Sequence, residues 1–325
     1  MNDALFHNVR YNCIHVTIAA MLRKLRYDVD LLFNQAGLYY DNRLEKNQQF
    51  FLDPYFRNVF EHIRNLFGVQ IIAEHYDDLQ LYLNRLEDLL FSGRTVGIFT
   101  DAFSLDYCKL YETMHFLHSF ELASCGEGLF EVHDHFYMHQ EHMTRHKMAQ
   151  VLEDFRKGLS DQFTLYYIDP DSKIDTNEHR YMETLRSNYL IMTGERCYIF
   201  KDTPQYPGTI GLKAIEESGE HLMQILDRLQ EDRPKTHISH VYTCLTEVAN
   251  SRHNYHVYLK KFGEDHLAEL YLSAHQGWMV YANLFMRATL YPGIDMKQRL
   301  RQRILAITEA EQMIVSCVGQ LLHQK

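Results

Sequence analysis

Residues 118–134 read HSFELASCGEGLFEVHD, and this stretch decides the fold of the first half of the chain. Two apolar segments, Leu117 to Ala123 and Leu129 to His133, flank the turn sequence Ser-Cys-Gly-Glu-Gly. Short segments of this kind, bounded by a glycine-containing connection, predict two strands joined as a β-hairpin. The hairpin fixes which polar side chains can meet across the two strands.

A histidine and an aspartate stand at the open end of this hairpin. If the turn is centred on Gly126, His118 lies directly opposite Asp134, above an apolar layer on the same face. Opposed side chains of a hairpin lie about 4.5–5.5 Å apart at Cβ, whereas a slip of one residue would put the pair on opposite faces. An imidazole beside a carboxylate is typical of a base held in one tautomer. His115 and His135 are nearby competitors for the role of base.

A cysteine near the N-terminus is the candidate nucleophile. Asn12 is a favoured N-cap and precedes apolar residues at helical spacing, which places Cys13 in the first turn of a predicted helix. Backbone N–H groups without partners and the positive end of the helix dipole favour a thiolate there, and the thiolate is the nucleophilic form. The Cys13 N–H is also a candidate donor to an oxyanion. The alternative is a buried structural cysteine.

Composition restricts the class of protein. The chain has 325 residues, of which 46% are hydrophobic and 23% charged, so we expect a globular protein of one or two domains. Its net charge is −10 and no Lys/Arg block appears, which argues against nucleic acid and anionic membrane as partners. We find neither an export signal nor a run of eighteen apolar residues, and the six cysteines are dispersed. These features predict a cytoplasmic protein with reduced thiols and no transmembrane span.

The pattern along the chain changes near Ser172. Strand and helix signals alternate before it, and helical periodicity dominates after it. We therefore predict an α+β protein with an α/β domain at residues 1–172 and a helix-rich domain at residues 173–325. The final helix, about Met296 to Leu322, is too apolar to stand in water alone. We expect it to pack across the helical domain and to help wall the site, with a homodimer contact as a further possibility.

A histidine cluster offers a competing interpretation. His135, His139, His142 and His146 are spaced by four, three and four residues, which would line one side of a helix and could bind a transition metal. However, no glutamate completes an HExxH motif, and a solvated helix fits the same residues. The sequence therefore predicts no metal and no cofactor.

Several short motifs resemble one protein family. They are Asn12-Cys13 at a helix start, Asp101-x-Phe-x-Leu-Asp-Tyr107, Tyr111-x-x-x-His115-x-x-His118 and Val132-x-Asp134. Together they resemble the N-terminal domain of butirosin biosynthesis protein H. The downstream stretch is similar to the helical partner domain of that family, at Gly208-x-x-Gly211-x-x-Ala214-Ile215 and from Arg252 to Trp278. The family usually has histidine before the cysteine, where this chain has Asn12.

The resemblance implies a papain-like fold and an acyl transfer. In such a site Cys13, His118 and Asp134 would move an acyl or peptidyl group from a carrier-protein thioester to a small-molecule amine, in natural-product biosynthesis. The expected partners are an acyl or peptidyl carrier protein and the amine. A basic patch for the acidic carrier would draw on Arg23, Lys24 and Arg26, which otherwise form a solvated helix face.

The sequence leaves several roles open. Asn12 or Asn8 is a candidate second donor to the oxyanion, and His115 is a candidate auxiliary residue. Water in place of an amine would make the protein a cysteine peptidase, amidase or thioesterase. A papain-like binding module without catalysis is the third possibility. Arg252, His256 and Trp278 are candidates to reach the cleft, with ordinary packing as the alternative.

Overall fold

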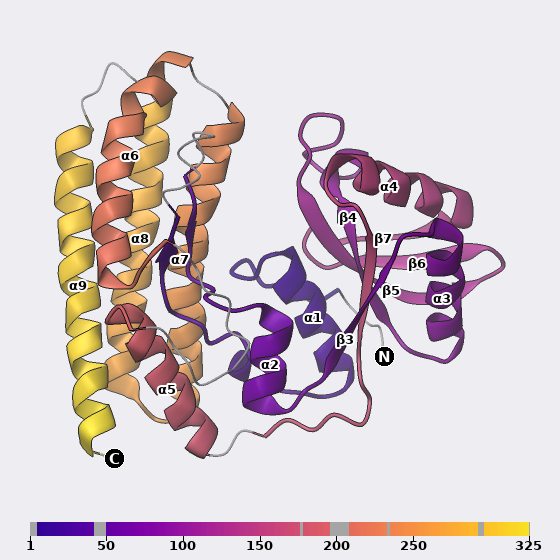
Figure 1. The fold of residues 1–325 in the computed structure, drawn as a ribbon, viewed down its shortest axis with the longest axis horizontal. Helices are drawn as coiled ribbons and strands as arrows, with labels where there is room; N and C mark the ends of the chain where they lie inside the picture. Colours follow the sequence, from indigo (N-terminus) through magenta and orange to yellow (C-terminus); the bar gives the residue numbers. More distant parts are fainter. Residues whose placement is uncertain are drawn as a thin grey trace. The chain divides into compact units, whose positions relative to one another are not determined.

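The protein is an α+β protein, as predicted, with helices and two antiparallel sheets (Figure 1). The chain forms two compact units, Met1–Val29 with Gly68–Ile174 and Asp30–Phe67 with Asp175–Lys325. The computed structural model describes residues 5–41, 50–175, 178–195, 208–232, 235–291 and 296–324.

The division differs from the predicted one in one segment. The second boundary, after Ile174, lies two residues from the predicted end of the first domain, but residues 30–67 belong to the helical unit. Within that unit Phe50 and Leu52 are part of the buried core. Local periodicity could not reveal this, because the strand Tyr39–Tyr40 of this segment pairs with Thr209 and Ile210, far along the chain.

The N-terminal unit is built on a six-stranded antiparallel sheet with strand order β3-β8-β4-β5-β6-β7. Phe120, Leu122 and Val132 face a core that α3 and α4 cover. Helix α1 lies on the other face, where it contacts Ser119 and Glu121 (Figure 1). The elements are α1 (Cys13–Lys24), β3 (Ile71–Tyr76), α3 (Leu79–Phe91), β4 (Val96–Asp101), the 3₁₀ turn η3 (Ala102–Ser104), β5 (Leu117–Gly126), β6 (Leu129–Asp134), β7 (His139–Thr144), α4 (Arg145–Gly158) and β8 (Phe163–Ile168).

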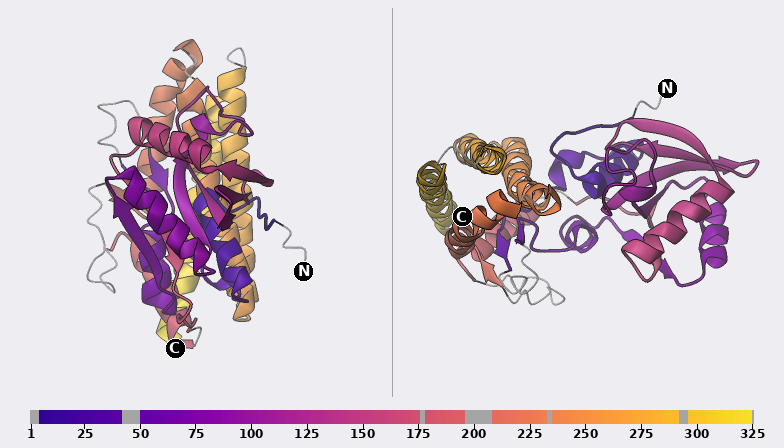
Figure 2. Two further views of the ribbon diagram at one scale, coloured as in Figure 1. Left: turned by 90° about the vertical axis from the view of Figure 1, so that its right-hand side faces the viewer. Right: turned by 90° about the horizontal axis from the view of Figure 1, so that it is seen from above.

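The helical unit consists mainly of long helices (Figure 2). It also contains a small three-stranded sheet of order β2-β1-β9. Its core is centred on Trp278, Tyr281 and Phe285 of α8, all at most 1% exposed. The final helix packs on α8, α6 and α5, which confirms the predicted packing role. The elements are β1 (Tyr39–Tyr40), β2 (Leu52–Asp53), α2 (Val59–Phe67), α5 (Glu178–Met192), β9 (Thr209–Ile210), α6 (Leu212–Asp232), α7 (Lys235–Lys261), α8 (Asp265–Leu290) and α9 (Lys297–Gln324).

Helix α9 also passes a test of length and composition for a membrane span. A window of 18 residues within it has a mean hydropathy of 1.2, and 22% of that window is buried. Core helices of soluble proteins and signal sequences pass the same test, so one such helix is weak evidence. The cytoplasmic location, the absence of a membrane partner and the homodimer contact stay predictions.

The predicted helical histidine row is wrong. His139 and His142 lie in β7, which pairs with β6 along its whole length, and α4 begins only at Arg145. Residues an odd number apart in a strand point to opposite faces, so the four histidines do not line one side of a helix. Pairing with a neighbouring strand has overridden the local helical spacing.

Candidate active site

Cys13 occupies the first position of α1, as predicted. Asn12 is the N-cap, and its Oδ1 accepts the His15 N–H at 2.9 Å. The backbone N–H of Cys13 donates to no acceptor among the described residues, as is usual for the first helical N–H. Cys13 is buried, and its sulfur lies 3.9 Å from the carbonyl oxygen of Leu117. Cys13 therefore lies against the start of β5, next to His118.

Hydroxyl groups lock the start of α1 onto the sheet. The Thr17 hydroxyl lies 2.8 Å from the Cys13 carbonyl oxygen and 3.2 Å from that of Ser119 on β5. The Ser119 hydroxyl in turn meets the Tyr166 hydroxyl at 2.6 Å. Tyr166 lies across the sheet over its pairing partner Gly97, where an added Cβ would stand 2.2 Å from the ring. Glycine at position 97 is therefore needed for this network.

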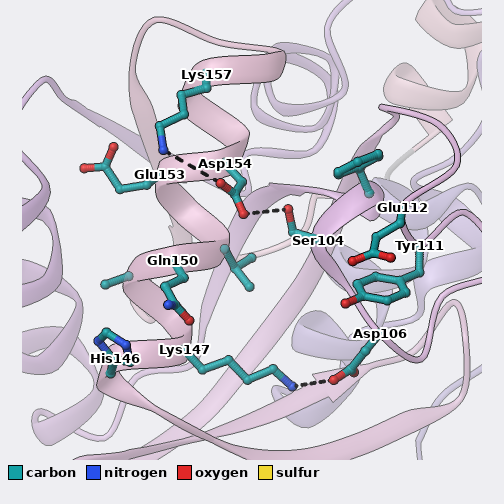
Figure 3. A pocket seen from close by; sticks show the side chains of 13 residues that line it. Ser104, Asp106, Tyr111, Glu112, His146, Lys147, Gln150, Glu153, Asp154 and Lys157 are labelled. Atoms are coloured by element: carbon teal, nitrogen blue, oxygen red, sulfur yellow. Dashed lines mark hydrogen bonds and ion pairs between the residues drawn. The ribbon is translucent and has the colours of Figure 1, made fainter.

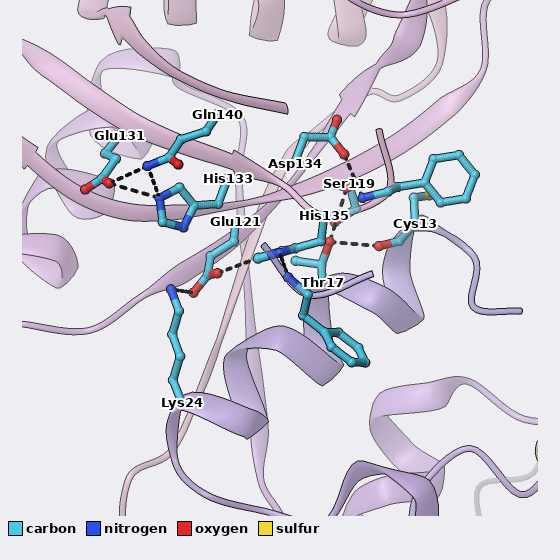
Figure 4. A network of polar contacts seen from close by, with 12 residues as sticks. Cys13, Thr17, Lys24, Ser119, Glu121, Glu131, His133, Asp134, His135 and Gln140 are labelled. Atoms are coloured by element: carbon cyan, nitrogen blue, oxygen red, sulfur yellow. Dashed lines mark hydrogen bonds and ion pairs between the residues drawn. The ribbon is translucent and has the colours of Figure 1, made fainter. Parts of the chain in front are cut away.

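His118 and Asp134 form the predicted pair. Nε2 of His118 lies 2.6 Å from Oδ2 of Asp134, and the two side chains are 2% and 0% exposed (Figure 4 shows the surrounding network). The predicted register is nevertheless wrong, because Leu122 pairs with Val132 and not with Phe130. This shift is an even number of residues, so both side chains keep the same face and meet diagonally.

A β-bulge is what keeps the pair on one face. Beside the turn Glu127-Gly128, where both residues have positive φ, Gly126 pairs with Leu129. Positive φ at both positions is the type I′ hairpin turn. Continued to the open end, this register would place the imidazole and the carboxylate on opposite faces. The bulge between Leu122 and Ser124 inserts one residue and restores the common face.

Four hydrogen bonds fix the Asp134 carboxylate. Oδ1 accepts the N–H groups of Phe136 and Tyr137, both at 3.0 Å, and Oδ2 accepts the Tyr107 hydroxyl at 3.0 Å in addition to His118. Burial acts to raise the pKa of Asp134, but these contacts outweigh it and lower the pKa below its usual value. Burial and the nearby carboxylate raise the pKa of Tyr107, so its phenol remains a donor. The motif that contains Tyr107 gives no local sign of this role, because the contact joins residues 27 positions apart.

His118 is held in its charged form. Burial acts to lower the pKa of His118, but hydrogen bonds to Asp134 and Cys13 outweigh it and raise the pKa to about 10. Because Asp134 takes Nε2, Nδ1 is the ring nitrogen left for Cys13. The rings of Tyr137 and Phe136 lie 5.1 and 5.9 Å from the imidazole. The imidazole thus lies between a carboxylate and the Cys13 sulfur, so that one proton can pass between Cys13 and His118.

The three auxiliary candidates lie in different settings. His115 is half exposed, bonds Asp101 through Nδ1 at 2.6 Å and stacks on Phe103, so it belongs to a separate pair. Asn8 accepts the Arg10 N–H, and Asn12 caps α1. Neither amide nitrogen donates a hydrogen bond to any part of the chain that the structure describes, which leaves both as oxyanion donors to be tested.

A separate cavity of about 660 Å³ lies beside α4 (Figure 3). Its wall contains an ion pair between Lys147 and Asp106 at 3.2 Å and a hydrogen bond between Ser104 and Asp154 at 3.3 Å. No cysteine is among its described lining residues. The cavity therefore lacks the nucleophile that the Cys13 site has.

The helical candidates make packing contacts within the helical unit, where Arg252 and Trp278 are buried and His256 is partly buried. Arg252 is fully buried and bonds Glu311 at 2.8 Å, and the Trp278 indole N–H donates to the same carboxylate at 2.9 Å. His256 bonds the Ala268 carbonyl oxygen. These contacts agree with ordinary packing, which was the alternative role of the three side chains.

Comparison with known proteins adds no further assignment. No protein-family model matches the chain, and no curated protein sequence matches it. The resemblance to the butirosin biosynthesis protein H family thus rests on the quoted motifs alone.

Proposed function

We propose that the N-terminal unit is a cysteine-dependent acyltransferase of papain-like type. Cys13 is the nucleophile, His118 the proton carrier and Asp134 the group that orients the imidazole. The proposal rests on the two contacts of one imidazole. Nε2 of His118 bonds the buried Asp134 carboxylate, and the same ring contacts the Cys13 sulfur at the N-terminus of α1. Such an arrangement separates nucleophile, base and orienting group into three fixed roles.

The reaction would run in two steps. The Cys13 proton resides on His118, which is then an imidazolium, and the Cys13 thiolate attacks the carbonyl carbon of the donor thioester. The bond to the carrier sulfur breaks, and the imidazolium protonates the departing thiolate, which leaves an acyl group on Cys13. The acceptor amine then attacks this thioester, His118 accepts the amine proton, and the Cys13 thiolate departs from the amide product.

The oxyanion of each tetrahedral intermediate needs hydrogen-bond donors. The backbone N–H of Cys13 is one, since it lies at the attacking residue and has no other acceptor among the described residues. An amide nitrogen of Asn8 or Asn12 would be the second. Loss of one such donor typically lowers the rate about 10²–10³-fold, so Asn8→Ala and Asn12→Asp separate the two candidates.

The donor is proposed to be a carrier-protein thioester and the acceptor a small amine, as the family resemblance implies. The basic patch suggested for docking is partly engaged within the N-terminal unit. Lys24 is paired with Glu121 at 3.0 Å, and the Arg23 guanidinium lies over the Phe6 ring. Arg26 has a positive φ at the end of α1. Carrier recognition would therefore need more than these three side chains.

Acyl labelling tests the mechanism directly. The chain is incubated with an acyl thioester of N-acetylcysteamine, quenched in acid and examined by intact mass and peptide mapping. The wild type should gain one acyl group on the peptide containing Cys13, and Cys13→Ala should gain none. Cys125→Ala is the matched control, because Cys125 lies on the same sheet at the hairpin turn and should not affect labelling.

The acceptor is tested in the same assay. Added primary amines should give amide product in competition with free acid. Free acid at every amine concentration would make the protein a hydrolase. Labelling of Cys13→Ala equal to the wild type would overturn the mechanism. Absence of labelling in the wild type, together with iodoacetamide reactivity at Cys13 unchanged by His118→Gln, would favour the non-catalytic binding module.

A further inference from the structure

We propose that Glu121, His133 and His135 form a binding site for a zinc-type divalent metal ion. The site lies in the N-terminal unit, on the face of the sheet that α1 covers (Figure 4). It is independent of the proposed acyl transfer, because its side chains point away from the face that holds His118 and Asp134.

The positions of the three side chains follow from strand geometry. His133 and His135 are two residues apart, so they share a face, and Glu121 stands directly opposite His133 on β5. All three side chains are at most 5% exposed, and one donor atom from each lies within 4.8 Å of the other two. Two ligands of a tetrahedral zinc stand about 3.4 Å apart, so small side-chain rotations would close the set.

The donor set suits zinc. Two imidazole nitrogens and one carboxylate oxygen, with a fourth position for water, form a common zinc arrangement. A second carboxylate already orients one ring, since Nε2 of His133 lies 2.9 Å from Oε1 of Glu131. A proton held on Nε2 by Glu131 leaves Nδ1 of His133 as the lone pair for a metal. Outer carboxylates of this kind fix the tautomer of metal-binding histidines.

Lys24 and His135 already bond the Glu121 carboxylate oxygens that a metal ion would bind. The Lys24 ammonium lies 3.0 Å from Oε1 of Glu121, and Nε2 of His135 lies 2.9 Å from Oε2. The Phe6 N–H donates to Nδ1 of His135 at 3.1 Å, so the neutral ring carries its proton on Nε2. The carboxylate is thus satisfied without an ion, and a metal must compete with Lys24.

Metal binding has a defined cost in this network. His135 must give its Nε2 lone pair to the metal, which moves its proton to Nδ1 and removes the acceptor of the Phe6 N–H. Lys24, whose side chain is 28% exposed, can turn toward solvent. Loading should therefore loosen the segment around Phe6.

The test is zinc titration of the chelator-treated full chain by calorimetry. We expect one Zn²⁺ per chain, with the affinity lowered at least about 100-fold in His133→Ala. Lys24→Met should bind about 10-fold more tightly, because it removes the competing cation. The control is His142→Ala, an exposed histidine of the neighbouring strand, which should change nothing.

The gain in Lys24→Met keeps the proposal testable if His133→Ala does not fold. No binding by either the wild type or Lys24→Met overturns it. Binding that is equal in Lys24→Met and the wild type overturns it as well, as does binding that His142→Ala weakens. A second measurement is hydrogen exchange at the Phe6 amide, which zinc should accelerate. Zinc binding without any change in that exchange would contradict the proposed exchange of partners at His135.

Discussion

The two units bury charged side chains in different ways. In the helical unit Arg252 and Glu311 are 0% and 1% exposed and bond each other, a carbonyl oxygen and an indole N–H. In the N-terminal unit His118 and Asp134 are equally buried, but the imidazole also contacts a thiol. Burial with good partners is therefore common to both networks. A nucleophile beside the charged pair is what distinguishes a candidate reaction site from a structural one.

The largest expected effect is on activity, and it should be confined to the network of His118 and Asp134. Asp134→Asn should lower the rate of Cys13 acylation about 10³–10⁴-fold, because the amide no longer fixes the His118 tautomer. Single-turnover labelling with an acyl thioester measures this rate. Glu311→Gln, which alters the carboxylate of the other buried network, is the control and should leave the rate within a few-fold. Equal losses in the two variants would mean that the assay reports folding and not chemistry.

Arg252→Met should give the largest effect on stability. It leaves the Glu311 carboxylate buried without its cation, which typically costs about 3–5 kcal/mol. Trp278 is the single tryptophan and bonds this carboxylate, so its fluorescence during denaturant unfolding reports the helical unit.

The double variant Arg252→Met with Glu311→Leu is the matched comparison. It removes both charges and should recover part of the loss. A single variant as stable as the wild type would show that the buried pair contributes little to the helical unit.

A smaller effect concerns the attachment of α1. Thr17→Val removes the hydroxyl that bridges the carbonyl oxygens of Cys13 and Ser119, which should cost about 1 kcal/mol. Hydrogen exchange of the β5 amides measures the local stability. Thr17→Ser keeps the hydroxyl and should stay near the wild type. If the β5 amides exchange equally fast in Thr17→Val and Thr17→Ser, the Thr17 hydroxyl does not help to position Cys13.

The candidate site was more predictable from sequence than the details that build it. The N-cap at Asn12 and the hairpin signal are local, so they correctly placed Cys13 on a helix and His118 beside Asp134. The register was wrong because the bulge after Leu122 depends on strand pairing and leaves no clear local signature. The pair was found only because the error was an even number of residues.

Other features depend on contacts between distant parts of the chain. Tyr107 bonds Asp134 across 27 residues, and Phe50 of the segment at residues 30–67 packs in a core formed mostly after residue 190. The Glu121–His133 pairing requires the true register, under which these residues are directly opposed. The sequence alone shows only that His133 and His135 share a face, because side chains alternate along a strand.

The smallest expected effect is an acid-dependent one at the surface of the N-terminal unit. Glu74 receives two hydrogen bonds from Arg85, at 2.7 and 2.9 Å, and further bonds from the Tyr76 and Tyr167 hydroxyls. The Arg85 contact lowers the pKa of Glu74 from its ordinary 4.5 to about 2. Because the folded-state pKa is lowered, the pair stabilises the fold above about pH 4.5, and this stabilisation is lost as the pH falls toward 2.

Solvent screening keeps the size of this effect small. The Arg85 side chain is 37% exposed, so we expect Glu74→Gln to cost only about 0.5–1 kcal/mol at pH 7. Hydrogen exchange at several pH values measures the free energy of unfolding of the N-terminal unit. The difference in this free energy between the wild type and Glu74→Gln should shrink as the pH falls from 4.5 to 2. Asp161→Asn is the control, since Asp161 is exposed and has no ion pair among the described residues. Its free energy of unfolding should equal that of the wild type at every pH. A difference for Glu74→Gln that is constant with pH would show that the carboxylate acts through packing and not through its charge.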